Sequence, residues 1–321
     1  MLDVRKLRYF ATVAELGSFT RAAAALHIAQ PALSRQVQQL EQEIGMDLLI
    51  RAGRKIQITD AGTAMLRHAR TIDRDFERMV EDMQARKDTP VGTVVFGIPP
   101  SLAESVVPRV VARVKGDLPM ITLKVVEGLT PVLADWIRDN KADLAILSLA
   151  MMSDADELPN LLVSPLVSED MVLAEPTGGH PVPPYYEPAD LNERPLVLSE
   201  MLASIVRRQL PDSDCLFRFD VDIDSVQAIK TMVLRGEAST ILPISMLSEE
   251  IAQGSVSASG ITPGAIRRQL VLAQPNYRQM TQAAEALKRS VQTLLSEMSK
   301  QGLFTLEKTT NAAAGASRGT G

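Results

Sequence analysis

The sequence predicts an α/β protein with three parts: an N-terminal winged helix-turn-helix, a long linker helix and a two-lobed α/β domain. Three observations support this prediction. Two short helical patterns joined by a tight turn occupy residues 17–45, a heptad repeat of apolar residues follows, and short apolar runs alternate with helical patterns from Val91 onward. The predicted boundaries are 1–60, 61–90 and 91–302, followed by a small, polar, disordered tail over 303–321.

The first pair of helices is contained in the stretch GSFTRAAAALHIAQPALSRQVQQLEQEIG, residues 17–45. Ser18 or Thr20 can cap the first helix, because a hydroxyl there accepts from N–H groups that the first turn leaves unpaired. The alanine-rich run that follows favours a helix over residues 20–26. Pro31 suits the first turn of a second helix, which is expected to begin near Gln30.

The second helix has one apolar and one polar face. Its apolar positions recur at helical spacing and predict a buried stripe of Leu33, Val37, Leu40 and Ile44. Off this stripe lie Gln30, Ser34, Arg35 and Gln38. Gln pairs with adenine, Arg with guanine, and Ser with a base edge or a phosphate, so this face is suited to the major groove. By itself, the segment also fits an amphipathic helix with a solvated polar face in an ordinary domain.

Two short β-prone runs, 47–51 and 55–59, flank Ala52-Gly53-Arg54 and predict a hairpin with a basic tip. Such a wing can lie along phosphates or enter the minor groove. The complete predicted DNA-contacting set is Ser18, Thr20, Gln30, Pro31, Ser34, Arg35, Gln38, Arg51, Arg54 and Lys55.

Residues 7–62, LRYFATVAELGSFTRAAAALHIAQPALSRQVQQLEQEIGMDLLIRAGRKIQITDAG, closely resemble the winged helix-turn-helix of LysR-type transcriptional regulators. The family usually has Phe at the position of Ile50 and Leu at the position of Ile58, and both differences keep an apolar residue. The segments LHIAQPALS and LLIR are more similar to the nitrogen-assimilation-control branch of this family. The resemblance implies sequence-specific binding to double-stranded DNA.

Composition fits a globular protein that works in the cytoplasm. Of the 321 residues, 45% are hydrophobic and 23% charged, and no apolar run is long enough to predict a membrane helix. The net charge is −5, yet residues 1–60 carry a balance of +2. The single cysteine, Cys215, has no partner for an internal disulfide, and an inert thiol fits it better than a redox sensor. The three histidines lack metal-ligand spacing, and no cofactor is predicted.

The region from Ala61 to about Lys87 predicts one helix of six or seven turns, since it has no Pro and no Gly after Gly62. Its apolar residues alternate by four and three, and predict a dimerisation seam of Met65, Ala69, Ile72, Phe76, Met79 and Met83. The alternative is that this seam packs on its own winged domain, and both can hold along different turns. The resemblance implies a homodimer, often assembled into a homotetramer, on an operator with dyad symmetry.

From Val91 the runs VGTVVFGI, ITLKVVEG and ADLAILSL alternate with helical segments, and this βαβαβ rhythm predicts a parallel sheet covered by helices. Ligands bind beyond the carboxyl ends of such strands, where helices begin. Ser101 and Thr130 there are candidate contacts for a carboxylate at a helix N-terminus, although each hydroxyl can serve only as a cap.

A second α/β unit follows, and the chain is expected to cross between lobes near Pro165 and Pro263. Lobe one then comprises 91–165 and 263–302, and lobe two comprises 166–262. This plan resembles the periplasmic-binding-protein-like effector domain of LysR-type regulators, which implies a ligand cleft with Ser199 facing Ser101. The predicted effector-binding set, for a small molecule such as an organic anion, is Pro100, Ser101, Leu102, Thr130, Ser148, Leu149 and Ser199.

The function predicted from these parts is a DNA-binding regulator controlled by a small-molecule effector, with RNA polymerase as an expected partner. A solute-binding or transport component is a second reading, since the last two-thirds of the chain can bind a metabolite alone. The winged domain argues against it. An enzyme is a third reading, which lacks a Ser-His-Asp, Cys-His or phosphate-cradling pattern at useful spacing.

Overall fold

The computed structural model describes residues 3–52, 55–84, 89–149, 158–178, 182–194, 196–210, 223–262 and 266–306. The chain divides into two compact units, one formed by 1–92 with 138–141 and the other by 93–137 with 142–321. Arg54, Cys215 and the predicted crossing at Pro263 lie outside the described residues.

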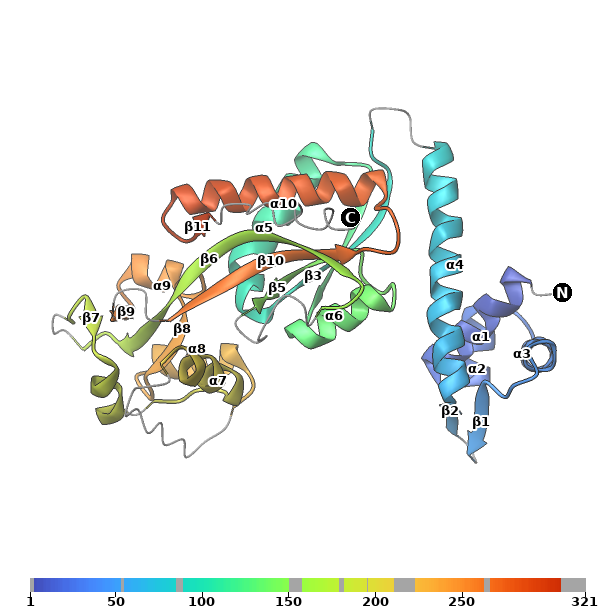
Figure 1. Ribbon diagram of the computed structural model, residues 1–321, viewed down its shortest axis with the longest axis horizontal. Helices are drawn as coiled ribbons and strands as arrows, with labels where there is room; N and C mark the ends of the chain where they lie inside the picture. Colours follow the sequence, from blue (N-terminus) through green and yellow to red (C-terminus); the bar gives the residue numbers. More distant parts are fainter. Residues whose placement is uncertain are drawn as a thin grey trace, which may run out of the picture. The chain divides into compact units, whose positions relative to one another are not determined.

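Three short helices build the core of the first unit: α1 (Val4–Leu16), α2 (Phe19–Ala25) and α3 (Gln30–Ile44) (Figure 1). The predicted starts of α2 and α3 are right to within a residue. Ser18, rather than Thr20, caps α2, since its hydroxyl accepts from the Arg21 N–H at 3.3 Å. The helices pack through a common buried cluster that includes Phe10, Val13, Leu33, Val37 and Leu40.

The predicted wing is a two-stranded antiparallel hairpin of β1 (Leu49–Ala52) and β2 (Lys55–Ile58), in which Ile50 pairs with Gln57. Ile50 is 50% exposed and Ile58 38%, so the core places little demand on the two positions where the family usually has Phe and Leu.

The wing is followed directly by the long helix α4 (Asp60–Gln84), which confirms the expected linker helix over the described residues. Gly62 in its first turn makes a close approach: a Cβ there would lie 2.1 Å from the carbonyl oxygen of Leu48. Only glycine fits where the helix start touches the chain leading into the wing.

The second unit is built on a nine-stranded sheet, with the order β4-β3-β5-β10-β6-β9-β7 and with β8 and β11 also paired to β6. The predicted βαβαβ rhythm is confirmed as β3 (Gly92–Ile98), α5 (Pro100–Asp117), β4 (Ile121–Glu127), α6 (Thr130–Arg138) and β5 (Leu144–Ser148). The sheet is not parallel throughout. Strands β3 and β5 are parallel, whereas β10 (Arg267–Pro275) runs antiparallel to both β5 and β6.

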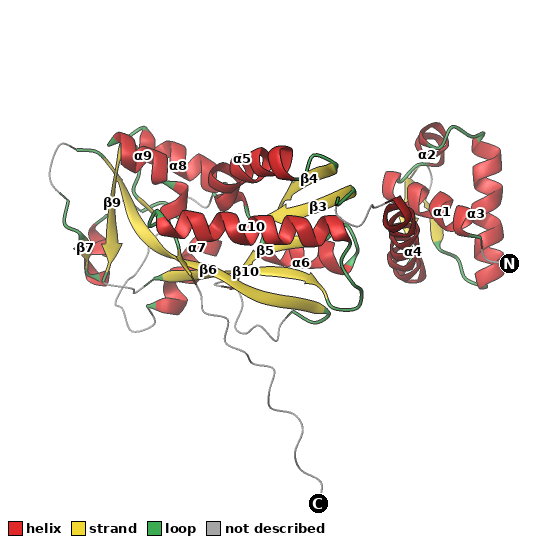
Figure 2. Cartoon of the chain, turned by 90° about the horizontal axis from the view of Figure 1, so that it is seen from above, coloured by secondary structure: helices red, strands yellow, loops and turns green. Residues whose placement is uncertain are grey.

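Helices cover both faces of the sheet in lobe one (Figure 2). Val94, Phe96 and Ile98 of β3 pack with α5 and with α10 (Gln282–Lys300), while Val95 packs with α6 on the other face. This two-sided burial explains why the strands read as nearly continuous apolar runs instead of alternating with polar residues.

The long strand β6 (Leu161–Pro176) passes from one lobe to the other. Its first part pairs with β10, and from Met171 it pairs with β8 and then β9. Val167 belongs to the core of lobe one and Met171 to the core of lobe two, so the change of lobe falls between them. The two-lobed α/β fold predicted from the sequence is thereby confirmed (Figure 1).

Lobe two surrounds its own apolar core, in which β6, α7 and α8 contribute most of the side chains. Its elements are β7 (Tyr185–Tyr186), η3 (Pro188–Glu193), α7 (Glu200–Gln209), α8 (Val226–Leu234), β8 (Thr240–Pro243), η4 (Ile244–Met246), α9 (Ser248–Gln253) and β9 (Val256–Ile261).

The predicted disordered tail begins too early. Phe304 is buried in the core of lobe one, and β11 (Thr305–Leu306) pairs with β6. An apolar side chain that fills core space after the last helix keeps the chain ordered to at least Leu306.

Candidate functional site

Helix α3 has a buried face and an exposed polar face, as its sequence predicts. Leu33, Val37 and Leu40 are buried. Gln30, Pro31, Arg35 and Gln38 are exposed, and Ser34 is partly buried. The helix ends at Gly45, whose φ of +75° closes the C-terminus in the left-handed region. The long polar side chains on this face are therefore available to a partner, and none of them is needed for the core.

The predicted DNA contacts outside α3 lie at the start of α2 and in the wing. Thr20, in the first turn of α2, is exposed, and Ser18 is partly buried while it caps that helix. Arg51 and Lys55 occupy the two strands of the wing next to its tip, where Ala52 pairs with Lys55. The side chains of Arg51 and Lys55, like residue Arg54, lie outside what the structure describes.

The apolar seam of α4 divides between two environments. Ala69 is only 3% exposed and, with partly buried Met65, packs into the core formed by α1–α3. Ile72, Phe76 and Met79 are 39%, 49% and 51% exposed. The side chain of Met83 is not described. The first turns of α4 thus pack on their own winged domain, because its core needs an apolar cover. The apolar residues of the later turns stay exposed.

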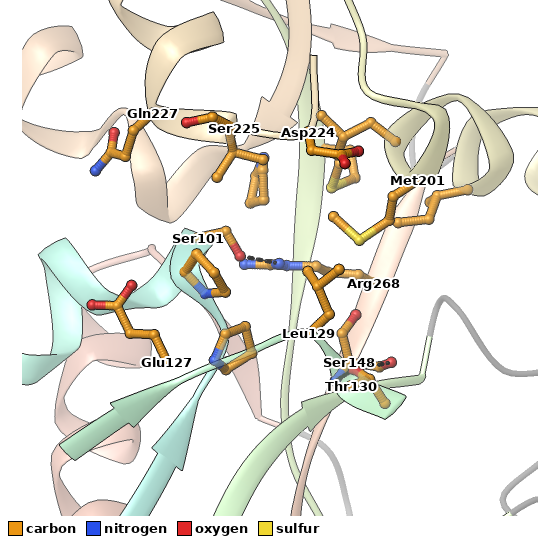
Figure 3. A pocket seen from close by; sticks show the side chains of 17 residues that line it. Ser101, Glu127, Leu129, Thr130, Ser148, Met201, Asp224, Ser225, Gln227 and Arg268 are labelled. Carbon is orange, nitrogen blue, oxygen red and sulfur yellow. Dashed lines mark hydrogen bonds between the residues drawn. The ribbon is translucent and has the colours of Figure 1, made fainter. Parts of the chain in front are cut away.

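A cavity of about 280 Å³ opens between the two lobes of the second unit (Figure 3). It is lined by the first turns of α5, α6, α7 and α8, by the ends of β4 and β5, and by one residue of β10. The described lining consists of Pro99, Pro100, Ser101, Glu127, Leu129, Thr130, Ser148, Met171, Met201, Leu202, Ile205, Asp224, Ser225, Val226, Gln227, Pro243 and Arg268. An apolar lining with a few polar groups is typical of small-molecule sites.

Arg268 and Ser101 form the polar centre of this cavity. The Arg268 Nη1 donates to the Ser101 hydroxyl at 2.7 Å, and Figure 3 shows this bond between the two lobes' linings. The Arg268 Nε donates at 2.7 Å to Glu169, which is the residue directly opposite on β6. Glu169 in turn accepts from the backbone N–H of Ser245 at 3.2 Å. A buried arginine is held in place by a buried carboxylate, and its five donors exceed the bonds that this pair uses.

Thr130, the first residue of α6, and Ser148, the last residue of β5, are bonded to each other. The Ser148 N–H donates to the Thr130 hydroxyl at 3.1 Å, and that hydroxyl lies 3.2 Å from the Ser148 carbonyl oxygen, to which it donates. Both residues line the cavity, but the Thr130 hydroxyl is already engaged with the backbone. Its first task is to tie the start of α6 to the end of β5.

Three of the predicted effector contacts lie away from the lining. Leu102 points into the core of lobe one, and Leu149 packs against the cluster around α6. Ser199 is buried and caps α7 by accepting from the Leu202 N–H at 3.2 Å. Helical phase directs Leu102 inward, and the hydroxyl of Ser199 is occupied as a cap, so neither side chain is part of the lining that contains Ser101.

Arg268 is missing from the predicted effector-binding set, although the sequence carries a signal for it. Arg268 shares its strand face with Leu270 and Leu272, and Glu169 shares its face with Val167 and Met171, all of them buried. A positive charge on the buried face of one strand and a negative charge on the buried face of another indicate a cross-strand ion pair. Asp224, Ser225 and Gln227 had no comparable signal, because the loop before α8 reaches the cavity only in the folded lobe.

A second ionic cluster joins the lobes beside the cavity. Lys230 of α8 is buried, and its Nζ lies 2.8 Å from Glu104 of α5 and 2.7 Å from Glu250 of α9. Gln227 also donates to Glu104, at 3.2 Å. We call Glu104, Lys230 and Glu250 the ionic clasp, because it connects lobe one to two helices of lobe two.

Comparison with known proteins decides the family. The model of the LysR substrate binding domain matches residues 87–296, which is well over half of the chain. The chain is a LysR-type transcriptional regulator. The model of the bacterial regulatory helix-turn-helix protein of the lysR family matches residues 4–63, which contain α1–α3 and the wing. This LysR-type regulator therefore combines a DNA-binding domain with an effector-binding substrate domain.

The similarity extends over nearly the whole chain. The SDS degradation transcriptional activation protein of Pseudomonas sp. is 29% identical over 90% of this chain and 95% of its own length. The nitrogen assimilation regulatory protein nac of Klebsiella aerogenes is 28% identical over 93% and 97%. A full-length OxyR variant from Pseudomonas aeruginosa has a TM-score of 0.71 at 25% identity, covering 91% of this chain and 98% of its own. Because the identity to nac is no higher than that to the SDS protein, the predicted nitrogen-assimilation-control branch is weakly supported.

No helix in the described part of this regulator has the length and apolar character needed to cross a membrane.

Proposed function

We propose that α3 of this LysR-type regulator reads base edges in the major groove through Gln30, Ser34, Arg35 and Gln38, with Pro31 starting the helix at the groove. The observation that carries this proposal is the exposed polar face of α3 opposite its buried stripe of Leu33, Val37 and Leu40. Long amide and guanidinium side chains on one helical face match adenine and guanine edges.

The flanking residues position this helix on the duplex. Ser18 and Thr20, at the start of α2, are proposed to contact one phosphate strand, and the wing residues Arg51, Arg54 and Lys55 to contact another or the minor groove. Support for the wing's part comes from the pairing of β1 with β2, which brings Arg51 and Lys55 to the same end of the hairpin. Contacts of this kind set orientation, whereas α3 sets sequence preference.

Selection of bound DNA from a random library, followed by measured affinities for the recovered operator, tests the reader. We expect Arg35→Ala to weaken operator binding by about 1–3 kcal/mol and to relax the preference at one base position. Arg289→Ala, which removes another exposed arginine, from α10, is the matched control and should leave both unchanged. Unaltered binding by Arg35→Ala would remove this residue from the reader.

The cavity between the lobes is proposed to bind the effector through Ser101 and Arg268, with Pro100, Thr130 and Ser148 shaping that side. First turns of four helices line the cavity, and their N–H groups carry partial positive charge. A small organic ligand with an anionic group fits this environment. Because both lobes line the cavity, a ligand that prefers one lobe arrangement shifts the population by its differential affinity, typically about 1–3 kcal/mol.

The open seam of α4 is proposed to pair with the same helix of a second copy through Ile72, Phe76 and Met79, continued by Met83. Three large apolar side chains that are 39–51% exposed on one helix support this pairing, since apolar surface of this kind is normally buried by a partner. The resulting homodimer presents two readers to a dyad-symmetric operator, and further assembly to a homotetramer is proposed.

This regulator is further proposed to act without catalysis, in the cytoplasm, with RNA polymerase as the partner that reads its state. Support comes from the relatives, whose names describe transcriptional regulation. The domains are proposed to divide near residues 60 and 90 as predicted from sequence, with the effector domain extended from 302 to at least Leu306 and the change of lobe placed between Val167 and Met171.

A further inference from the structure

Charge in the effector cavity is unevenly compensated. Three of the described lining residues are charged: Glu127, Asp224 and Arg268. The charge of Arg268 is already matched by the buried Glu169, whose Oε1 lies 2.6 Å from its Nη2. Glu127 and Asp224 have no hydrogen-bond or ion-pair partner in the part of the chain that the structure describes. Both side chains are exposed, so a ligand in the cavity can reach them, and the described residues supply no counter-charge to either.

The two carboxylates come from opposite lobes. Glu127 is the last residue of β4 in lobe one, and Asp224 stands just before α8 in lobe two. Figure 3 places them on opposite sides of the bond between Ser101 and Arg268. Elsewhere around the cleft the carboxylates are paired: Glu169 with Arg268, and Glu104 and Glu250 with Lys230. Among the described lining residues Arg268 is the one cation, and Glu169 already neutralises it, so Glu127 and Asp224 differ from the paired carboxylates around them.

A buried polar side chain also faces this cavity with bonding capacity to spare. Arg268 is 5% exposed, and its Nη2 nitrogen makes no hydrogen bond of regular geometry even though it lies beside Glu169. Nη1 carries two N–H groups, of which one donates to Ser101. The cavity thus offers donors for an acceptor at its centre and carboxylates for a cation at its walls, separated by apolar side chains such as Leu129 and Met201.

We infer that the effector of this regulator is a small amphiphilic zwitterion, in which a carboxylate engages Ser101 and Arg268 and an amine engages Glu127 or Asp224. This inference rests on the effector cavity proposed above. A simple anion would be repelled by the two exposed wall carboxylates, and a simple amine would leave the donors of Arg268 unused. A cavity of about 280 Å³ suits a molecule the size of an amino acid with an apolar side chain.

Matched sets of ligands test the inference by calorimetric titration of the full chain. The three sets are leucine with isocaproate and isoamylamine, phenylalanine with hydrocinnamate and phenethylamine, and ε-aminocaproate with caproate and hexylamine. In at least one set we expect the zwitterion to bind about tenfold more tightly than the acid or the amine alone, as one charge-assisted bond would give. Acids that bind as tightly as the zwitterions in every set, or no binding by any member at millimolar concentration, would overturn the inference.

Isosteric variants locate the amine. The double variant Glu127→Gln/Asp224→Asn should lose about tenfold in affinity for the zwitterion while its affinity for the deaminated acid does not fall. The control Glu237→Gln/Glu249→Gln removes two exposed carboxylates that do not line the cavity, and should keep the preference. A preference that survives in the cavity variant overturns the inference.

A cavity-filling variant separates this inference from the effector site on which it rests. Ser101→Leu should abolish binding of every ligand, while circular dichroism and a cooperative thermal transition show that it is folded. If the acids bind best and lose binding in Ser101→Leu, the zwitterionic effector is refuted and the proposed effector site between the lobes stands. Any ligand whose binding survives Ser101→Leu binds elsewhere, and would overturn both.

Discussion

Removal of the central cation of the ionic clasp is the sharpest test of how the two lobes are held together. In Lys230→Met the side chain keeps its length and apolar stem but loses the ammonium that connects Glu104 of α5 to Glu250 of α9. Lys230 is almost fully buried, so no water takes its place readily. We expect lower stability and a weaker connection between the lobes.

The size of the loss follows from the two ion pairs. The side chain of Glu250 is 14% exposed, so its bond to Lys230 at 2.7 Å has the value of a buried charge-assisted bond, about 1.5–3 kcal/mol. The side chain of Glu104 is 47% exposed, and its bond is therefore discounted to the surface value of about 0–1 kcal/mol. The sum predicts that Lys230→Met lowers the free energy of unfolding by about 1.5–4 kcal/mol.

The clasp also has a predicted pH dependence. The hydrogen bond from Lys230 holds the pKa of Glu104 below its ordinary value, although burial of the carboxyl acts in the opposite direction. A carboxyl with a lowered pKa in the folded state stabilises the fold above its ordinary pKa and loses that contribution as the pH falls through the lowered value. Burial lowers the pKa of Lys230, but its bonds to Glu104 and Glu250 outweigh this and raise it overall, so the lysine stays charged throughout that range.

Urea unfolding followed by circular dichroism, at neutral pH and in the acid range below about pH 4.5, measures both effects. The difference between wild type and Lys230→Met should shrink at acid pH, because protonation of Glu104 removes part of the same interaction. Lys300→Met, at an exposed position of α10, is the matched control and should change stability by less than about 0.5 kcal/mol. Equal stabilities of Lys230→Met and wild type at neutral pH would refute the reasoning.

Two further predictions concern the first unit. Ile72→Asp/Phe76→Asp should convert the oligomer to monomers in sedimentation velocity, since two charges would have to be buried in the seam, and an unchanged oligomer would refute pairing through α4. Gly62→Ala should lower stability by about 1–3 kcal/mol, because its Cβ would meet the Leu48 carbonyl oxygen. Gly116→Ala in α5, where the space is open, should be neutral or stabilising. Equal effects of the two variants in thermal unfolding would contradict the close approach at Gly62.

Much of the fold could be predicted because its signals are local. Pro31 and the alternation of Leu33, Val37 and Leu40 determine where α3 begins and which face it buries, and both depend only on neighbours within four residues. The same holds for the βαβαβ segment of lobe one. Long-range pairing is less visible: the antiparallel insertion of β10 between β5 and β6 makes the sheet mixed, and no local pattern specifies that neighbour.

The candidate site shows the same limit in individual residues. Ser101 was predictable because it combines a strand end with a helix start, and it does line the cavity. Ser199 has the same local pattern, yet its hydroxyl is used to cap α7. A short polar side chain at a helix start can either cap or bind, and only the surrounding packing decides between the two.

The sequence by itself determined that this chain has a winged reader, a helical linker and two α/β lobes, because helix and strand periodicity, caps and turns are written in short segments. Only the tertiary structure decided which charged side chains share the cavity. Arg268, Glu127 and Asp224 lie far apart in the chain, and their electrostatic balance exists only once β10, β4 and the start of α8 are brought together. Charges act through space, so the chemistry of the cavity follows from distances that no segment of the sequence contains.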